Sequence, residues 1–170
     1  MYSTYDNCVS LFEGHSEKSI EIAMNNIYNN LKKVAYHQSN SHAFLKHSDK
    51  TDEYLLNRIN FDGCEFATSY YSPEVAKDAT YRVLVNRWRV IQNFLMSKND
   101  RLTLHWKFFG ESLGFGYSCH TNGVFEDCYK VIVVLQKDVN LPWGFHVLTT
   151  YPIITNDLIA DETVCEYKEV

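Results

Sequence analysis

The sequence has too few cysteines, too widely scattered, to build a disulfide framework. It contains an odd number of them, namely Cys8, Cys64, Cys119, Cys128 and Cys165. No two form a Cys-x-x-Cys pair, which argues against a structural zinc site. Cys119 and Cys128 are close enough in sequence to face each other across a hairpin, so a bridge there stays open beside free thiols, which we favour. We therefore expect a domain that folds without disulfides.

Long apolar runs and the common metal-binding and nucleotide-binding motifs are missing as well. No stretch approaches the roughly 20 apolar residues that cross a membrane, and residues 1–6 lack the basic start and apolar segment of a signal peptide. HExxH, GxGxxG, GxSxG and P-loop motifs are absent. We expect no membrane segment, no metal and no cofactor. We expect a cytoplasmic site of action, with any export following a route without a signal peptide.

An excess of positive charge is also lacking, because the formal net charge is −5. This balance argues against a simple nucleic-acid-binding protein. Residues 157–170 hold five acids and one base, so this acidic tail carries −4 and residues 1–156 carry only −1. A nearly neutral body can still contain a local basic cleft. With 170 residues and 45% hydrophobic content, the chain is long enough for one globular domain with a real core.

The first half of the chain has helical patterns. Apolar residues at helical spacing predict a helix over residues 17–36, and a polar loop follows over 37–45. Thr51 is a good N-cap for a short helix over residues 52–59. The segment Ser72-Pro73-Glu74 predicts a second helix start, and its apolar face continues to Met96, which makes this the longest helix. Residues 65–71 are short and extended in character.

The second half has strand patterns. Alternating apolar and polar residues predict a half-buried strand over 102–108, a short strand over 115–118 and a last strand over 145–151, stopped by Pro152. Residues 121–123 signal a hairpin turn. Residues 129–135 are apolar on both faces, which indicates a central strand. Helices first and antiparallel strands second predict an α+β fold, with N-terminal helices packed on a curved antiparallel sheet.

The most informative stretch runs from His47 to Arg58. It joins a loop that carries His47 and Lys50 to the short helix that carries Arg58. The free amides at this helix start suit an anion, although Asp52 and Glu53 add negative charge there. A histidine, a lysine and an arginine around a helix start are suited to phosphate chemistry. The plain alternative is a capped surface helix with solvated charges.

A second group of candidates lies on the last strand. Thr149 and Tyr151 are two residues apart, so they share a face of the strand, and Val147 should share it too. A hydroxyl and a phenol side by side can bind a phosphate or move a proton. The alternative is a threonine–tyrosine face packed on a helix, which sheets often have.

Seven histidines offer proton carriers near neutral pH. His42 and His47 share the loop beside the arginine helix and are the better candidates. His105 and His146 lie on the polar side of predicted strands, and we expect them to be solvated. Cys119 and His120 are adjacent on a strand and point to opposite faces, which disfavours a thiol–histidine dyad.

Three motifs together resemble a known family, the RNase A-like toxin domain at the C-termini of bacterial contact-dependent growth inhibition (CdiA-type) proteins. The family has a histidine loop leading into Leu-Leu-x-Arg, an Ala-Ser/Thr-rich segment before a helix, and a closing strand Gly-Phe-x-Val-Leu-Thr-x-Tyr-Pro. They stand here as His47-Ser48-Asp49-Lys50-Thr51-Asp52-Glu53-Tyr54-Leu55-Leu56-Asn57-Arg58, Phe66-Ala67-Thr68-Ser69-Tyr70-Tyr71-Ser72, and Gly144-Phe145-His146-Val147-Leu148-Thr149-Thr150-Tyr151-Pro152. The resemblance covers about residues 40–153.

The chain departs from the family in the histidine loop. The loop usually opens Gly-Gly-His-Thr and here reads Asn40-Ser41-His42-Ala43. Ser48 and Asp49 replace Val-Gly after the histidine.

The resemblance implies an RNase A-like fold and a ribonuclease toxin, a hydrolase that acts as an endonuclease on RNA without metal. The implied active site consists of His47, Arg58, Thr149 and Tyr151, which should converge in one cleft. Lys50 and His42 would contact the substrate. His47 is the implied base or acid, and Arg58 the group that stabilises charge on the phosphoryl oxygens.

The sequence also predicts a domain organisation and partners. Residues 1–39 form an N-terminal helical extension, 40–156 the RNase A-like domain, and 157–170 the acidic tail. The implied partners are RNA, with transfer RNA as one candidate, and a cognate immunity protein. The competing hypothesis is a non-catalytic binding module with the same fold, or a partner protein of a toxin system.

Overall fold

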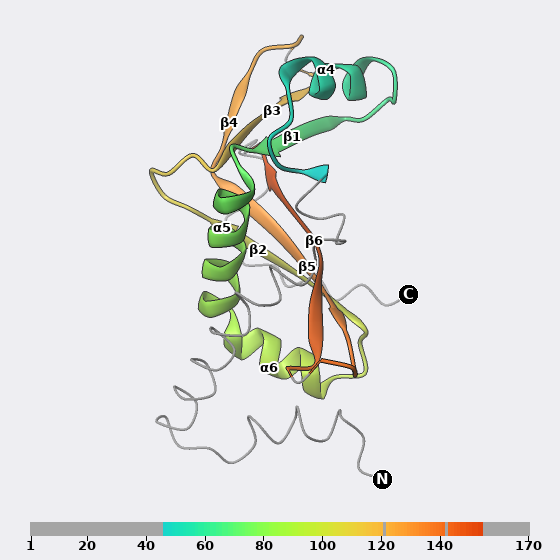
Figure 1. The fold of residues 1–170 in the computed structure, drawn as a ribbon, viewed down its shortest axis with the longest axis vertical. Helices are drawn as coiled ribbons and strands as arrows, with labels where there is room; N and C mark the ends of the chain where they lie inside the picture. Colours follow the sequence, from blue (N-terminus) through green and yellow to red (C-terminus); the bar gives the residue numbers. More distant parts are fainter. Residues whose placement is uncertain (1–45, 121, 142, 155–170) are drawn as a thin grey trace.

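The computed structural model describes residues 46–120, 122–141 and 143–154, and these residues form an α+β fold (Figure 1). Their elements follow the order α4 (Asp52–Asn60), β1 (Phe66–Tyr70), α5 (Pro73–Asn86), α6 (Trp88–Met96), β2 (Arg101–Lys107), β3 (Gly114–Ser118), β4 (Glu126–Cys128), β5 (Lys130–Lys137) and β6 (Phe145–Ile153). The predicted fold class is confirmed, with the strands divided between two sheets. The helix expected over 17–36, the loop over 37–45 and the acidic tail lie outside the described residues.

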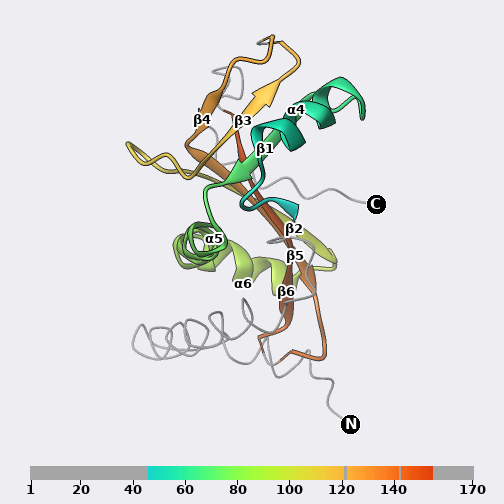
Figure 2. The ribbon, with the colours of Figure 1, turned by 45° about the horizontal axis from the view of Figure 1, so that its top comes forward.

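The smaller sheet has the strand order β1-β3-β4 and is covered by α4 (Figure 2). Leu55 of α4 packs with Ala67 of β1 and Tyr117 of β3, and all three are buried. β1 and β3 lie so close together that a Cβ on Gly116 would stand 2.6 Å from the carbonyl oxygen of Ala67. In the turn between β3 and β4, Asn122 and Gly123 both have positive φ, which fits the predicted hairpin signal.

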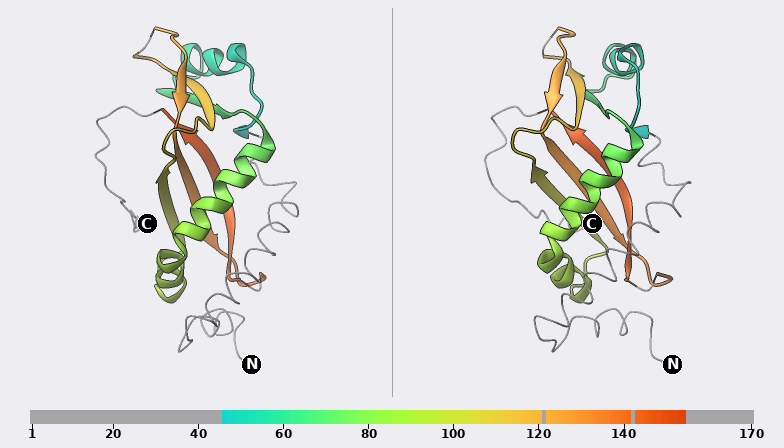
Figure 3. Two further views of the ribbon diagram at one scale, coloured as in Figure 1. Left: turned by 90° about the vertical axis from the view of Figure 1, so that its left-hand side faces the viewer. Right: turned by 60° about the vertical axis from the view of Figure 1, so that its left-hand side comes forward.

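The larger sheet has the order β2-β5-β6, so β5 is central as its apolar pattern predicts. α5 and α6 cover one face of this sheet (Figure 3). The main core fills the space between them, with residues that include Ala76, Ala79, Val83, Ile91, Phe94, Leu102, Leu104, Val131, Val133, Leu135 and Phe145. The opposite face of the sheet is the one that carries the candidate site.

The single long helix predicted from Pro73 to Met96 is wrong. α5 ends at Asn86 and α6 begins at Trp88, with Arg87 outside helical geometry at φ −114° and ψ 16°. The amide of Arg87 still donates to the carbonyl oxygens of Val83 and Leu84, so the last turn of α5 is closed before the chain bends. After the bend, Phe94 and Leu95 of α6 still pack in the core. Because the apolar spacing continues through the bend, the sequence pattern does not reveal that the helix axis changes direction.

Two details of β6 also differ from the prediction. The strand runs through Pro152 to Ile153, because β6 lies at the edge of its sheet and an edge strand tolerates a missing amide. Val147 does not share a face with Thr149. Val134 pairs with Thr149 while Leu135 pairs with Val147, so Leu148 is an extra residue and forms a β-bulge. The bulge puts Val147 with the core residues and Thr149 with Tyr151 on the other face.

The two sheets meet where β1 approaches β6. The hydroxyl of Thr68 donates to the carbonyl oxygen of Pro152 at 2.6 Å. Beneath this contact the hydroxyls of Tyr70 and Thr150 lie 2.7 Å apart, and Thr80 of α5 donates to Thr150 at 3.0 Å. All three hydroxyl-bearing residues are buried. This junction fixes β1 and its neighbouring loop against the face of β6 that carries Tyr151.

The described cysteines are free thiols, as predicted. Cys128 is buried and pairs across the β3–β4 ladder with Gly114, while Cys119 is exposed beyond the other end of β3. They stand at opposite ends of β3, so no bridge joins them. Cys64 is half-buried and free, and Cys8 and Cys165 lie outside the described residues.

Candidate active site

The loop that carries His47 is attached to the end of β1. The amide of Tyr70 donates to the carbonyl oxygen of His47 at 2.7 Å, and the amide of Asp49 donates to the carbonyl oxygen of Tyr70 at 3.1 Å. The amide of Lys50 donates to the hydroxyl of Ser69 at 3.0 Å. Because these bonds satisfy successive backbone groups, they hold His47 in register with a strand that is itself fixed to β6.

Two residues of this loop show the effect of replacing Val-Gly by Ser48-Asp49. Asp49 has φ +56°, the left-handed region that glycine adopts most easily and that aspartate tolerates better than most residues. Ser48 is buried, and its hydroxyl has no hydrogen-bond partner among the residues that the structure describes. Such a buried hydroxyl costs about 1–3 kcal/mol. The loop therefore keeps the backbone shape expected of a glycine at the position of Asp49, at some cost in stability.

Arg58 projects from the last turn of α4. The helix begins as predicted, because the hydroxyl of Thr51 accepts from the amide of Tyr54 at 3.2 Å. At the other end, one terminal nitrogen of Arg58 donates to the sulfur of Cys64 at 3.4 Å, and Nε lies 3.9 Å from a carboxylate oxygen of Asp62. The Arg58 side chain is 35% exposed, so its guanidinium is held on one side and open on the other.

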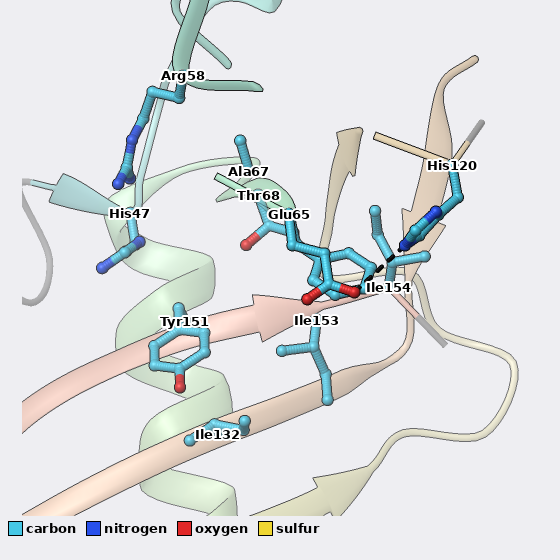
Figure 4. Close-up of a pocket in the computed structure, with 11 residues that line it drawn as sticks. His47, Arg58, Glu65, Ala67, Thr68, His120, Ile132, Tyr151, Ile153 and Ile154 are labelled. Atoms are coloured by element: carbon cyan, nitrogen blue, oxygen red, sulfur yellow. Dashed lines mark hydrogen bonds and ion pairs between the residues drawn. The ribbon is translucent and has the colours of Figure 1, made fainter. Parts of the chain in front are cut away.

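His47, Arg58 and Tyr151 line one cavity of about 790 Å³ on the open face of the larger sheet (Figure 4). The remaining lining residues are Glu65, Phe66, Ala67, Thr68, His120, Ile132, Ile153 and Ile154. The ring centroids of His47 and Tyr151 are 5.3 Å apart, with the rings tilted by 39°. Figure 4 shows the guanidinium of Arg58 hanging above His47, with Tyr151 below it. A loop, a helix and a strand thus bring a base, a cation and a phenol together.

The structure adds no other predicted site residue to the described lining of this cavity. Thr149 shares the face of Tyr151, but it is not among the cavity-lining residues. Lys50 does not line the cavity, and its ammonium lies 5.4 Å from the ring centroid of Tyr54. The first turn of α4 does not line this cavity either, so an anion site at the helix start stays a separate prediction. His42 lies outside the described residues.

Burial and charge set the protonation states of the two central side chains. Burial, and to a smaller extent the charges of Arg58, Lys46 and Lys50, together lower the pKa of His47 from 6.5 to about 4. His47 is therefore a neutral imidazole at neutral pH, and its ring nitrogens have no hydrogen-bond partner in the described part of the chain. Burial raises the pKa of Tyr151, so its phenol keeps its proton. His47 and Tyr151 thus combine an imidazole nitrogen that can accept a proton with a phenol that can donate one.

This shift predicts that the protein loses stability on acidification. Between pH 6.5 and about 4 the unfolded chain binds a proton at His47 and the folded chain does not, so the free energy of unfolding falls as the pH falls. We expect a loss of about 1–3 kcal/mol over this interval from His47 alone. Urea denaturation at a series of pH values, for the wild type and His47→Gln, measures it. Parallel pH dependences for the two proteins would contradict the assignment.

Sequence reasoning missed Glu65 and His120, which form the far end of the cavity. Nε2 of His120 lies 3.2 Å from a carboxylate oxygen of Glu65. The two residues are brought together by the β1–β3 pairing, which continues through a bond from the amide of Cys119 to the carbonyl oxygen of Glu65 at 3.0 Å. No local pattern around either residue signals that pairing, so the sequence offered nothing to find them by.

His146 also differs from its prediction. It is half-buried rather than solvated, and its Nδ1 lies 3.0 Å from a carboxylate oxygen of Asp138. His105 is half-buried as well and has a partner. Both lie outside the cavity lining.

Within residues 46–120, 122–141 and 143–154, no cluster of three or more His, Cys, Asp or Glu side chains could hold a metal ion. No described helix is long and apolar enough to span a membrane.

Comparison with known proteins gives two matches and one negative result. A family model described as "Bacterial CdiA-CT RNAse A domain" matches residues 41–152. A crystal structure of a CdiA-CT/CdiI complex from Y. kristensenii 33638 is similar to this chain with a TM-score of 0.62 and 21% sequence identity. That similarity covers 66% of this chain and 98% of the other. No curated protein matches the sequence.

Proposed function

Since the chain belongs to the bacterial CdiA-CT RNase A domain family, we propose that it is a ribonuclease toxin whose active site is the cavity lined by His47, Arg58 and Tyr151. The observation that carries the proposal is the approach of His47 to Tyr151, with Arg58 in the same cavity, although about a hundred residues separate the two ends of the site. A neutral imidazole, a protonated phenol and a permanent cation are the groups that RNA transesterification needs.

In the first step, His47 accepts the proton of a ribose 2′-hydroxyl. Its neutral state makes this role available across the physiological pH range. A base with a pKa of about 4 is weak. However, a bound phosphodiester places a negative charge against the cations that lower this pKa, so binding of RNA raises the basicity of His47. The freed 2′-oxygen then attacks the neighbouring phosphorus.

In the second step, the bond from phosphorus to the 5′-oxygen breaks, and Tyr151 gives its proton to that oxygen. The product ends are a 2′,3′-cyclic phosphate and a 5′-hydroxyl. Arg58 donates to the non-bridging oxygens while they gain charge, because its planar guanidinium stays protonated throughout. Thr149, on the same face as Tyr151, donates a further hydrogen bond to these oxygens. Lys50 and His42 contribute contacts to neighbouring phosphates.

The family match over residues 41–152 supports a wider organisation of the chain. The catalytic domain spans residues 40–156, preceded by an extension (1–39) and followed by an acidic tail (157–170). The similar crystal structure is a CdiA-CT/CdiI complex, which supports a cognate immunity protein for this chain. RNA is the substrate and the cytoplasm of a recipient cell is the site of action.

The proposal predicts cleavage of RNA without metal. The purified protein, incubated with total RNA in EDTA, should yield fragments with cyclic-phosphate and 5′-hydroxyl ends. Ligation by an enzyme specific for cyclic-phosphate ends, followed by sequencing, detects them. Cleavage that needs added Mg²⁺ or leaves 3′-hydroxyl ends would contradict the mechanism. Bound but intact RNA would favour the non-catalytic binding module.

A further inference from the structure

The cavity is longer than the proposed chemistry requires. His47, Arg58 and Tyr151 occupy one end, and Glu65 with His120 the other (Figure 4). A volume of about 790 Å³ lies within the range of sites that enclose a whole small molecule, roughly 300–1,000 Å³, and exceeds the need of one phosphate group. A further group of the substrate, attached to the reacting phosphate, therefore has room at the Glu65 end of the cavity.

The walls between the two ends are largely apolar. Ile132 and Ile153 rise from the same face of the larger sheet as Tyr151, and Ile154 follows β6. Phe66 closes the other side, 42% exposed, with its ring edge-on to the His120 ring at a centroid distance of 6.5 Å. Such walls suit the faces of a nucleobase, which stacks on aromatic and packs on aliphatic side chains.

The far end carries a negative charge that is held in place. A carboxylate oxygen of Glu65 lies 3.2 Å from Nε2 of His120, which orients the carboxylate, and the backbone bond from Cys119 to Glu65 fixes the two residues relative to each other. The side chains of Glu65 and His120 remain 65% and 62% exposed, so a ligand can reach both oxygens of Glu65, and the one beside His120 can accept a second hydrogen bond. A carboxylate repels phosphate and attracts N–H donors.

We propose that Glu65, oriented by His120 and walled by Phe66 and the isoleucines, is a guanine-binding subsite. Guanine alone among the four bases presents two adjacent donors, N1–H and the N2 amino group, on its Watson–Crick edge. They can donate in parallel to both oxygens of one carboxylate. Adenine and cytosine place a ring acceptor beside their amino group, and uracil flanks its N3–H with two carbonyl oxygens. A carboxylate repels these acceptors.

This subsite rests on the proposed ribonuclease function and predicts preferential cleavage next to guanosine. A bidentate contact of this kind discriminates by roughly 10- to 100-fold. We expect kcat/KM for a short RNA with one guanosine at the reacting site to exceed that for the matched uridine RNA by this factor. Glu65→Gln should remove the preference, because its amide nitrogen opposes one guanine donor, so the ratio of kcat/KM between the guanosine and uridine RNAs should fall to about 1. Glu53→Gln removes the same charge from exposed α4 and should keep the preference.

A binding measurement tests the subsite apart from catalysis. Titration calorimetry with guanosine 3′-monophosphate and uridine 3′-monophosphate should show tighter binding of the guanosine nucleotide by the wild type, and a difference that disappears in Glu65→Gln. Even cleavage at all four bases, a preference that survives Glu65→Gln, or equal loss in Glu53→Gln would overturn the subsite and leave the ribonuclease standing. RNA left intact by the wild type would overturn the ribonuclease, and equal affinity for the two nucleotides would then overturn the subsite as well.

Discussion

His47→Ala should lower the rate of RNA cleavage by about 10²–10⁴-fold, the usual contribution of a positioned proton-transfer group. His47 is the imidazole that faces Tyr151 in the cavity, and its neutral state suits proton abstraction. The fold should survive, because the loop is held by backbone bonds to β1 that do not involve the imidazole. Cleavage of a fluorescent RNA, with circular dichroism as the check on folding, measures both effects.

His146→Gln is the matched control, because this histidine pairs with Asp138 outside the cavity lining. Its cleavage rate should remain close to that of the wild type. In bacteria, expression of the wild type and of His146→Gln should stop growth, and His47→Ala should relieve the arrest. Growth arrest of equal strength from His47→Ala would tell against His47 as the base.

The pH dependence gives a second readout of the same residue. The acid limb of kcat/KM reports the pKa of the base in the free enzyme. It should therefore lie near pH 4, the value to which burial and neighbouring cations lower the pKa of His47. The acid limb of kcat should lie higher, because the bound phosphodiester stabilises the imidazolium. An acid limb of kcat/KM at pH 6.5 would mean that the general base is a histidine with an unperturbed pKa, and would contradict the assignment to His47.

Arg58→Ala should lower cleavage by about 10²–10³-fold, as expected for loss of a preorganised donor to a developing anion. It should also move the acid limb of kcat/KM upward, because the Arg58 charge is one of the causes that lower the pKa of His47. Arg58→Lys keeps the charge and loses the planar fork, so it should lower the rate while leaving the acid limb in place.

Arg82→Lys is the control for the arginine series. Arg82 lies on α5 and forms an exposed ion pair with Glu111 of the loop between β2 and β3, and neither residue lines the cavity. Its substitution should leave both the rate and the pH profile unchanged. A rate for Arg58→Lys equal to that of the wild type would mean that charge alone suffices at this position and that bidentate contact plays no part.

The sequence by itself determined the local elements, because their causes lie within a few residues. Thr51 and Ser72 cap α4 and α5 as their patterns predict, since each hydroxyl accepts from an amide three residues on. The doubly apolar run of β5 marked a central strand, and β5 does lie between β2 and β6, with one face buried in the core and the other half-buried. The three motifs also sufficed to identify the family, which the match over residues 41–152 confirms.

Tertiary structure decided what depends on partners far away in the chain. The break at Arg87 divides the predicted helix into α5 and α6, and the bulge at Leu148 changes which residues join Tyr151 on its face. A one-residue shift of this kind reverses the face of every side chain on one side of it, and no local pattern announces it. The passage of β6 through Pro152 likewise depends on the edge position of that strand.

For the site as well, the sequence indicated some features and the tertiary structure decided the others. Residue types along the chain named His47, Arg58 and Tyr151 as candidates, but only the attachment of the histidine loop to β1, and of β1 to β6, brings them into one cavity. Burial in that cavity makes His47 neutral, and the β1–β3 register sets Glu65 beside His120. Solvation and neighbouring charge belong to a residue's surroundings in the fold, so they could be read only once the strands were paired.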